Sequence, residues 1–204
     1  MSAFLATDPF ATAPLELDRA PAARRVSLAR PTHRSVDPPA LPISTLVEIA
    51  EGLARAEALW RPHVSHDPLS RTSVRLVGTE AYEVWLLGWT RDQRVDFHDH
   101  GGANAAFVVL EGELREITLE TGGTTIKRLR AGRTATVPSG TIHDVINPRD
   151  APATSLHVYA NPLKSMTFYD RDGRASHTEL VERVPALISS AAPSRALHPG
   201  GSDR

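Results

Sequence analysis

Residues 73–160 consist of short runs rich in β-forming side chains, and Gly or Pro residues such as Gly140 and Pro148 separate them. Many short strands with closely spaced turns are typical of an antiparallel sandwich or barrel. We expect hairpin turns at 111–113 and 121–124, where glycines lie between two runs. Strands are predicted at 73–78, 82–90, 95–99, 104–110, 113–120, 124–130, 134–138, 142–147 and 154–160.

A helix is predicted before these strands, from Ser44 to Trp60. Thr45 followed by Glu48 resembles a capping box, which would begin the helix. An apolar stripe at a spacing of three to four residues predicts that the helix covers one face of the barrel. The stripe consists of Leu46, Ile49, Leu53, Ala56 and Trp60.

The composition indicates one domain with two tails. The chain has 204 residues, of which 41% are hydrophobic and 23% charged, and this is enough for one sizeable core. Residues 1–40 are rich in Ala, Pro and Arg without periodicity, so we predict a disordered or loosely docked arm. We predict that the domain spans residues 41–188 and that residues 189–204 form a disordered tail.

Charge and hydropathy exclude several classes of partner. The net charge of −1 gives no nucleic-acid footprint, and no apolar run is long enough to span a bilayer. The N-terminus does not resemble a signal peptide. The chain contains no Cys, so disulfides, thiolate metal sites and a Cys nucleophile are ruled out. We expect a cytoplasmic monomer that binds neither nucleic acid nor membrane.

Three histidines indicate a metal site. His98 and His100 form an H-x-H pair, and the period of two in a strand places both imidazoles on one side. His143 follows a Pro-Ser-Gly turn and would arrive from a later strand to complete a face of three nitrogens. Imidazole suits zinc, copper, iron and nickel, so the ligand type alone does not identify the metal.

The histidines lie in segments that resemble the two motifs of the cupin superfamily. The second motif is matched in order by Gly132, Pro138, Gly140, His143 and Asn147. The first contains His98, His100 and Gly112, but its usual glutamate ligand would fall on Asn104 or Ala105, and neither supplies a carboxylate. The resemblance therefore predicts an all-β cupin, a double-stranded β-helix or jelly-roll barrel, with a three-histidine site that leaves coordination positions open.

Further motifs resemble the cysteine dioxygenase family over roughly residues 70–165. Ser155, His157 and Tyr159 match its S-x-H-x-Y segment, and alternation places all three on one side of a strand. The resemblance implies an iron(II) enzyme that adds both atoms of O2 to the sulfur of a small thiol, with L-cysteine as the first candidate, and yields a sulfinic acid. Tyr159 would hydrogen-bond substrate or oxygen, His157 would hold its hydroxyl, and Ser155 would fix the histidine tautomer.

The family also uses an arginine upstream of the histidines to bind the substrate carboxylate, since a guanidinium fork matches a carboxylate. Arg75 is the preferred candidate and Arg71 is the alternative. Many eukaryotic members crosslink a cysteine to the active-site tyrosine; Ala105 stands at that position here. The aromatic residue often found two positions before the arginine is Ser73 if Arg75 has this role.

Three alternative functions remain at this stage. The first is the same reaction on another thiol acid, such as 3-mercaptopropionate. The second is a different cupin enzyme, such as an isomerase or a quercetinase-like dioxygenase. The third is a non-catalytic cupin that binds a metal or small ligand. We expect Asp99 and Asp144 to point away from the metal by alternation, and His63 and His66 to have surface roles.

Overall fold

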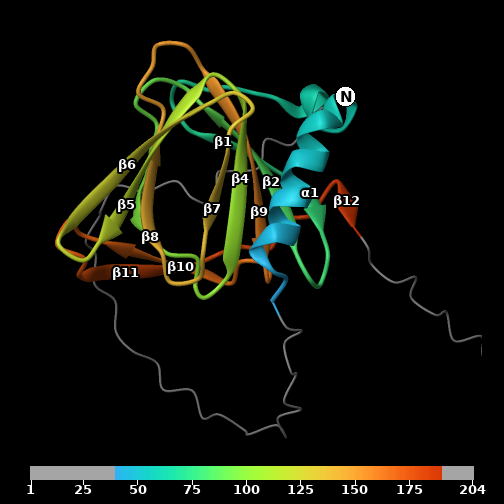
Figure 1. Cartoon of the computed structure of the whole chain (residues 1–204). Coiled ribbons are helices and arrows are strands. Elements are labelled where there is room, and N and C mark those ends of the chain that lie inside the picture. The colour runs from blue at the N-terminus through green and yellow to red at the C-terminus, as the bar shows by residue number, and fades with distance from the viewer. Residues whose placement is uncertain (1–39, 190–204) are drawn as a thin grey trace, which may run out of the picture.

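The structure, a computed structural model, describes residues 40–189, which form two six-stranded β-sheets with a helix beside one of them (Figure 1). The first sheet has the order β12 (Ile188–Ser189), β1 (Thr72–Gly78), β2 (Glu83–Trp89), β9 (Ala153–Ala160), β4 (Asn104–Glu111) and β7 (Thr134–Val137). The second has the order β11 (Ala175–Leu180), β10 (Ser165–Tyr169), β3 (Arg94–His98), β8 (Ile142–Ile146), β5 (Glu113–Glu120) and β6 (Gly123–Arg130). The pairs are antiparallel except β1 with β12.

The predicted all-β cupin barrel with a helical N-terminal cover is confirmed, and all nine predicted strands are present. Strands β10, β11 and β12 were not predicted. The turn at 121–124 is a hairpin between β5 and β6, as expected. The prediction at 111–113 is wrong, because β4 and β5 belong to different sheets. Gly112 carries the chain between the sheets at a φ of 77°, and a side chain there would meet the carbonyl of Pro152.

Alternation along β2 and β9 separates the interior of the barrel from its outer, helix-covered face. Trp85, Leu87 and Trp89 of β2 belong to the core cluster between the sheets, as does Tyr159 of β9. Residues of the opposite parity on the same strands belong to a second cluster, which includes residues of the helix. They include Val84, Leu86, Leu156 and Val158. Both faces of these central strands are therefore buried, and polar side chains on the inner parity lie inside the barrel.

The predicted helix is divided into α1 (Ile43–Arg55), α2 (Glu57–Trp60) and the short 3-10 helix η1 (Arg61–His63). Helix α1 packs against β4, β9 and β7 (Figure 1), and Leu46 and Ala50 are completely buried there. Burying a leucine side chain contributes about 1.5–3 kcal/mol. The expected capping box is wrong: the N-cap residue is Pro42, and no side chain caps the helix.

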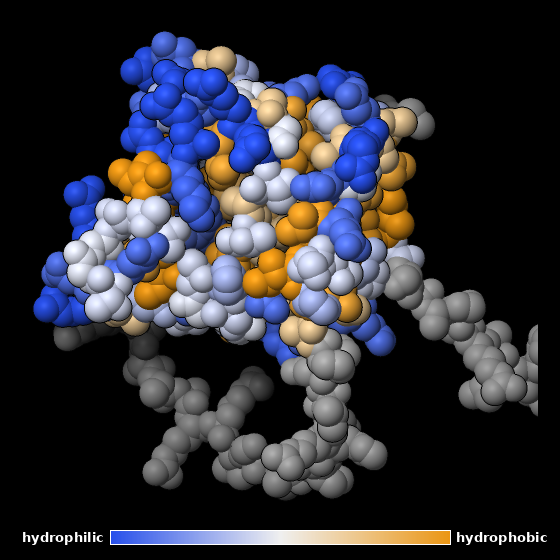
Figure 2. Space-filling model, in the orientation of Figure 1, coloured by the Kyte–Doolittle hydropathy of each residue, from blue (hydrophilic) through white to orange (hydrophobic). Residues whose placement is uncertain are grey.

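The surface in Figure 2 is mixed, with hydrophilic side chains gathered over its upper part and apolar patches interrupted by polar residues lower down. The large exposed apolar residues of the described chain come from several different elements: Leu59, Leu69, Ile126, Leu180, Leu187 and Ile188. Scattered apolar residues of this kind are normal on a protein surface. Within residues 40–189, no helix has the length and apolar character needed to cross a membrane.

The predicted N-terminal arm and C-terminal tail lie outside the described residues, apart from residues 40 and 189 at their inner ends. Ser189, the first residue of the predicted tail, belongs to β12, which pairs with β1. After β10 and β11 of the second sheet, the chain has therefore returned to the first sheet at the last residue that the structure describes.

Candidate metal centre and adjoining pocket

The structure brings the three predicted histidines together inside the barrel. His98 ends β3 and is the register partner of His143 in β8, while His100 lies in the connection to β4. Their candidate ligand nitrogens all lie within 4.8 Å of one another. The three residues are buried, with exposed fractions of 3%, 4% and 1% for His98, His100 and His143. One ion between the sheets could therefore contact all three rings.

Hydrogen bonds to the outer ring nitrogens orient two of these histidines. The Nδ1 of His98 donates to the carbonyl of Asp96 at 2.8 Å, and the Nδ1 of His143 donates to Oε1 of Glu116 at 3.0 Å. Each bond occupies Nδ1 on the side away from the cluster, so Nε2 is the ring nitrogen left to bind a metal. The Nε2 atoms of His143 and His100 converge to 3.3 Å.

The electrostatic environment keeps His98 and His100 neutral. Burial, followed by the proximity of His143, lowers the pKa of both side chains well below the usual histidine value. Neutral imidazole is the form that binds metal. Three buried, convergent imidazoles fit a divalent transition-metal ion.

Glu116 was not identified from the sequence. It lies on β5 with an exposed fraction of 1%, and its Oε2 has no hydrogen-bond partner within the described structure. A buried carboxylate with an unsatisfied oxygen is costly, and a cation held by His143 would offset that cost. Glu116 shares strand parity with the fully buried Leu114, so a charged residue on the apolar side of a strand was the available signal.

Ser155, His157 and Tyr159 form a buried chain of hydrogen bonds along β9. The Oγ of Ser155 lies 2.9 Å from Nε2 of His157, and Nδ1 of His157 lies 3.4 Å from the Tyr159 hydroxyl. The Tyr159 ring packs edge-on against His100 with 5.0 Å between ring centroids. Burial raises the pKa of Tyr159 well above its usual value, so its hydroxyl stays protonated. The three residues thus place a neutral hydroxyl beside the histidines.

A pocket adjoins the histidines and contains about 300 Å³ of space, including its open mouth. Arg71 is one of the residues that line it, is buried to 6% exposure, and stacks on Trp89 with its guanidinium carbon 4.7 Å from the ring centroid. The complete lining is Arg71, Leu87, Trp89, Val95, His98, His143, Val145, His157, Tyr159 and Met166.

The structure does not bring Arg75, the preferred arginine, into this lining. Its guanidinium pairs with Glu83 at 2.9 Å and donates to the carbonyl of Val184 at 3.0 Å. These contacts engage Arg75 in holding a C-terminal segment to β1. The alternative, Arg71, is the arginine that the fold places at the pocket.

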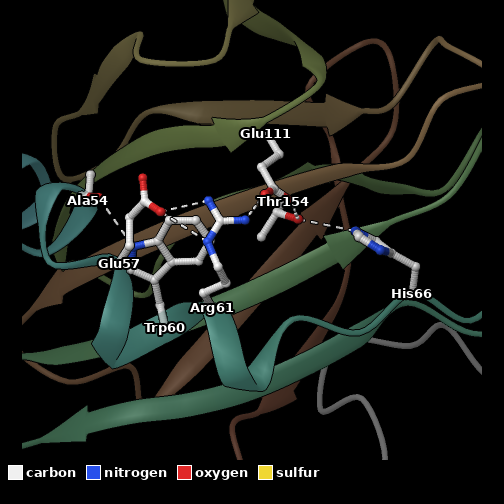
Figure 3. Close-up of polar contacts among 7 residues, drawn as sticks. All are labelled: Ala54, Glu57, Trp60, Arg61, His66, Glu111 and Thr154. Carbon is white, nitrogen blue, oxygen red and sulfur yellow. Dashed lines mark hydrogen bonds and ion pairs between the residues drawn. The ribbon is translucent and has the colours of Figure 1, made fainter.

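The segment that leads to Arg71 is fastened to the end of the barrel, as Figure 3 shows. Arg61 pairs with Glu57 and with Glu111 at the end of β4, and Glu111 also accepts from Thr154. His66 Nε2 contacts Thr154 Oγ1 at 3.1 Å and the neighbouring carbonyl of Ala153 at 3.0 Å. His66 was expected to have a surface role, but its ring is half-buried and anchors this segment.

Gly88 allows the same segment to lie directly over β2. A Cβ atom at this position would collide with the carbonyl of Ser65 and with the Thr72 side chain. The Thr72 hydroxyl also donates to the Ser65 carbonyl. The close backbone approach, which only glycine permits, helps to set where β1 begins and hence where Arg71 lies.

Asn104 and Ala105 stand where the usual cupin carboxylate ligand would be, and they have structural contacts instead. Asn104 donates to the Leu41 carbonyl at 3.4 Å and accepts from the Ser139 amide at 3.0 Å, while Ala105 is buried in the core. Asn104 therefore links the start of the helical segment to the turn before His143. Of the two aspartates beside the histidines, Asp99 accepts from Tyr169, and the buried Asp144 pairs with Arg94.

The fold and the three-histidine group together define a cupin with a candidate metal centre. A family profile described as cysteine dioxygenase type I matches residues 25–172, more than half of the chain. The chain belongs to this family. Membership makes it a cupin-type, metal-dependent dioxygenase.

Solved structures of other proteins resemble parts of the chain. One, from Thermus thermophilus, has a TM-score of 0.46 and 24% identity, over 50% of this chain and 93% of that chain. A double-stranded β-helix protein from Klebsiella pneumoniae has a TM-score of 0.45 and 20% identity, over 60% and 94%. A cupin superfamily protein from Desulfitobacterium hafniense has a TM-score of 0.44 and 14% identity, over 50% and 87%. At these scores the likenesses say nothing about activity.

Proposed function

We propose that this protein is an iron(II)-dependent thiol dioxygenase that oxidises L-cysteine to cysteine sulfinic acid with O2. The observation that carries the proposal is that His98 and His143 line the same pocket as Arg71 and Tyr159. A metal centre, a carboxylate-binding cation and a hydroxyl donor thus share one small space. Family membership supports the reaction class.

Arg71 binds the carboxylate of the substrate in this proposal. Its guanidinium can form two parallel hydrogen bonds to a carboxylate, and its burial strengthens them by excluding water. The carboxylate fixes one end of the substrate, so the thiol end is directed toward the histidines. An iron(II) ion held by His98, His100 and His143 would favour the thiolate and activate dioxygen when bound.

Tyr159 supplies a hydrogen-bond donor at the reacting end of the pocket. Its hydroxyl remains protonated because burial raises its pKa, and it can donate to the sulfur or to oxygen. Leu87, Val95 and Val145 line the pocket and exclude water from the reacting atoms.

A thiol acid without an amino group, such as 3-mercaptopropionate, is the second candidate substrate. The residues that line the described pocket include no aspartate or glutamate that could pair with a substrate ammonium group. A substrate that has only a carboxylate and a thiol would leave no charge unpaired.

Anaerobic iron loading followed by O2 uptake with a panel of thiols tests the proposal. We expect sulfinate with cysteine or 3-mercaptopropionate, and little with cysteamine, which lacks a carboxylate. His143→Ala should lose both iron and activity, because it removes one of three ligand nitrogens. An iron-loaded protein that binds thiols without producing sulfinate would instead support the non-catalytic alternative.

A further inference from the structure

Trp89 adds a fourth member to the chain of hydrogen bonds on β9. Its indole Nε1–H donates to Oγ of Ser155 at 2.8 Å, and both residues are completely buried. An indole nitrogen can only donate, so the Ser155 oxygen must accept in this bond. The hydrogen of the Ser155 hydroxyl therefore points away from Trp89, toward another acceptor.

Because Ser155 accepts from Trp89, its hydroxyl donates the next hydrogen bond, which goes to His157. The Ser155 hydroxyl hydrogen has His157 Nε2, at 2.9 Å, as its available acceptor among the described contacts. If His157 Nε2 carried the proton instead, the Ser155 hydroxyl hydrogen would be buried without an acceptor, at a substantial cost in free energy. His157 is neutral, because burial lowers its pKa well below the usual value, so its single proton lies on Nδ1.

The last bond of the chain then determines the orientation of the Tyr159 hydroxyl. Nδ1–H of His157 points to the Tyr159 oxygen at 3.4 Å, and the His157 ring is held by stacking on Phe107, with 4.7 Å between centroids and 5° between planes. Because Tyr159 accepts from His157, its own hydrogen is free to point into the pocket that it lines.

We propose that Trp89 is a positioning residue that fixes the direction of the Ser155–His157–Tyr159 hydrogen bonds, so that Tyr159 presents its hydrogen to the pocket. The same indole carries the Arg71 guanidinium on its face at 4.7 Å. One side chain in the barrel core therefore orients both the donor and the carboxylate-binding group. The kinetic consequences rest on the proposed dioxygenase function, whereas the hydrogen-bond direction does not.

The test uses the full chain with ¹⁵N-labelled histidine rings, and NMR measures which His157 nitrogen carries the proton. His157→Gln assigns the signals. We expect protonated Nδ1 and unprotonated Nε2 in the unaltered protein, and a mixture of the two tautomers in Trp89→Phe and in Ser155→Ala. Trp85→Phe, which removes a buried indole from the same strand, is the matched control and should keep the single tautomer.

A proton on Nε2 of the unaltered protein overturns the proposal, as does an unchanged tautomer in a folded Trp89→Phe variant. If Trp89→Phe does not fold, the Trp89 indole proton is measured in Ser155→Ala. A shift of this signal to that of a weaker hydrogen bond supports the proposal, and an unchanged signal contradicts it. These readouts need no turnover, so they remain valid even if no thiol is oxidised.

Kinetics supply an independent readout if a thiol is turned over. Trp89→Phe should lower kcat about fivefold to tenfold, as expected for one lost hydrogen bond, and raise KM through Arg71. In a Ser155→Ala background, the same substitution should raise KM alone. An equal fall in kcat in both backgrounds would contradict the proposed route through Ser155.

Discussion

Replacing Glu116 with Gln should weaken metal binding without unfolding the barrel. The Glu116 carboxylate accepts the Nδ1–H of His143 at 3.0 Å, and each side chain is only 2% exposed, so water cannot replace this contact. Gln has the same shape and retains an acceptor oxygen, but it lacks the charge that makes the opposite ring nitrogen a stronger ligand. We expect metal affinity to fall about 10- to 100-fold, which is about 1.4–2.8 kcal/mol.

The assay is competition for Fe²⁺ against a chelator of known affinity under anaerobic conditions, with Zn²⁺ as a redox-inert comparison. Glu113→Gln is the matched control. Glu113 lies on the same strand but pairs with Arg128, Arg130 and Arg149, so its loss should leave metal affinity unchanged. A Glu116→Gln protein that binds metal within about twofold of the unaltered chain would refute the role of this carboxylate.

The remaining predictions concern the pocket and the pH dependence of stability. Arg71→Lys should lower kcat/KM for a carboxylate-bearing thiol about tenfold, mainly by raising KM, because Lys lacks the planar fork. Arg75 lies outside the pocket lining, so Arg75→Lys should leave KM unchanged. Equal effects of the two substitutions would remove the reason to prefer Arg71. Tyr159→Phe should retain iron, measured by metal analysis, and lose much of kcat; an unchanged rate would exclude the donor role. In the metal-free chain, the free energy of unfolding should decrease as the pH falls below about 6.5, by up to about 1.4 kcal/mol per pH unit for each of His98, His100 and His157, because the unfolded chain takes up protons that the folded chain excludes. Denaturant titrations between about pH 7.5 and 5.5 measure this slope, and a flat or opposite slope would contradict the lowered pKa values of His98, His100 and His157.

Local spacing made much of the fold and the histidine cluster predictable. S-x-H-x-Y places its side chains on one side of β9 by parity, and H-x-H predicts the convergence of His98 and His100, although His100 lies just beyond the end of β3; the structure has both groups inside the barrel. Strand β11 could not be predicted from alternation, because its residues are mostly exposed and its sequence has no alternating apolar pattern. The hairpin predicted at 111–113 failed because a turn signal does not state which sheet the next strand joins.

The choice between the two arginines depended on contacts distant in the sequence. Arg71 directly precedes β1 and stands four residues before Arg75, an even spacing, so alternation could not separate the two. Glu83 and the Val184 carbonyl engage Arg75, while Trp89 lies beneath Arg71. Glu116 was overlooked because its partner, His143, comes from a strand much later in the chain.

The most direct test of the central claim is turnover of a thiol by the iron-loaded chain under ¹⁸O₂, with mass spectrometry of the product. We predict a sulfinate in which both oxygen atoms carry the label, formed only when iron and a carboxylate-bearing thiol are present. A product with one labelled oxygen, or O2 uptake that does not depend on the thiol, would contradict assignment of this chain as a thiol dioxygenase.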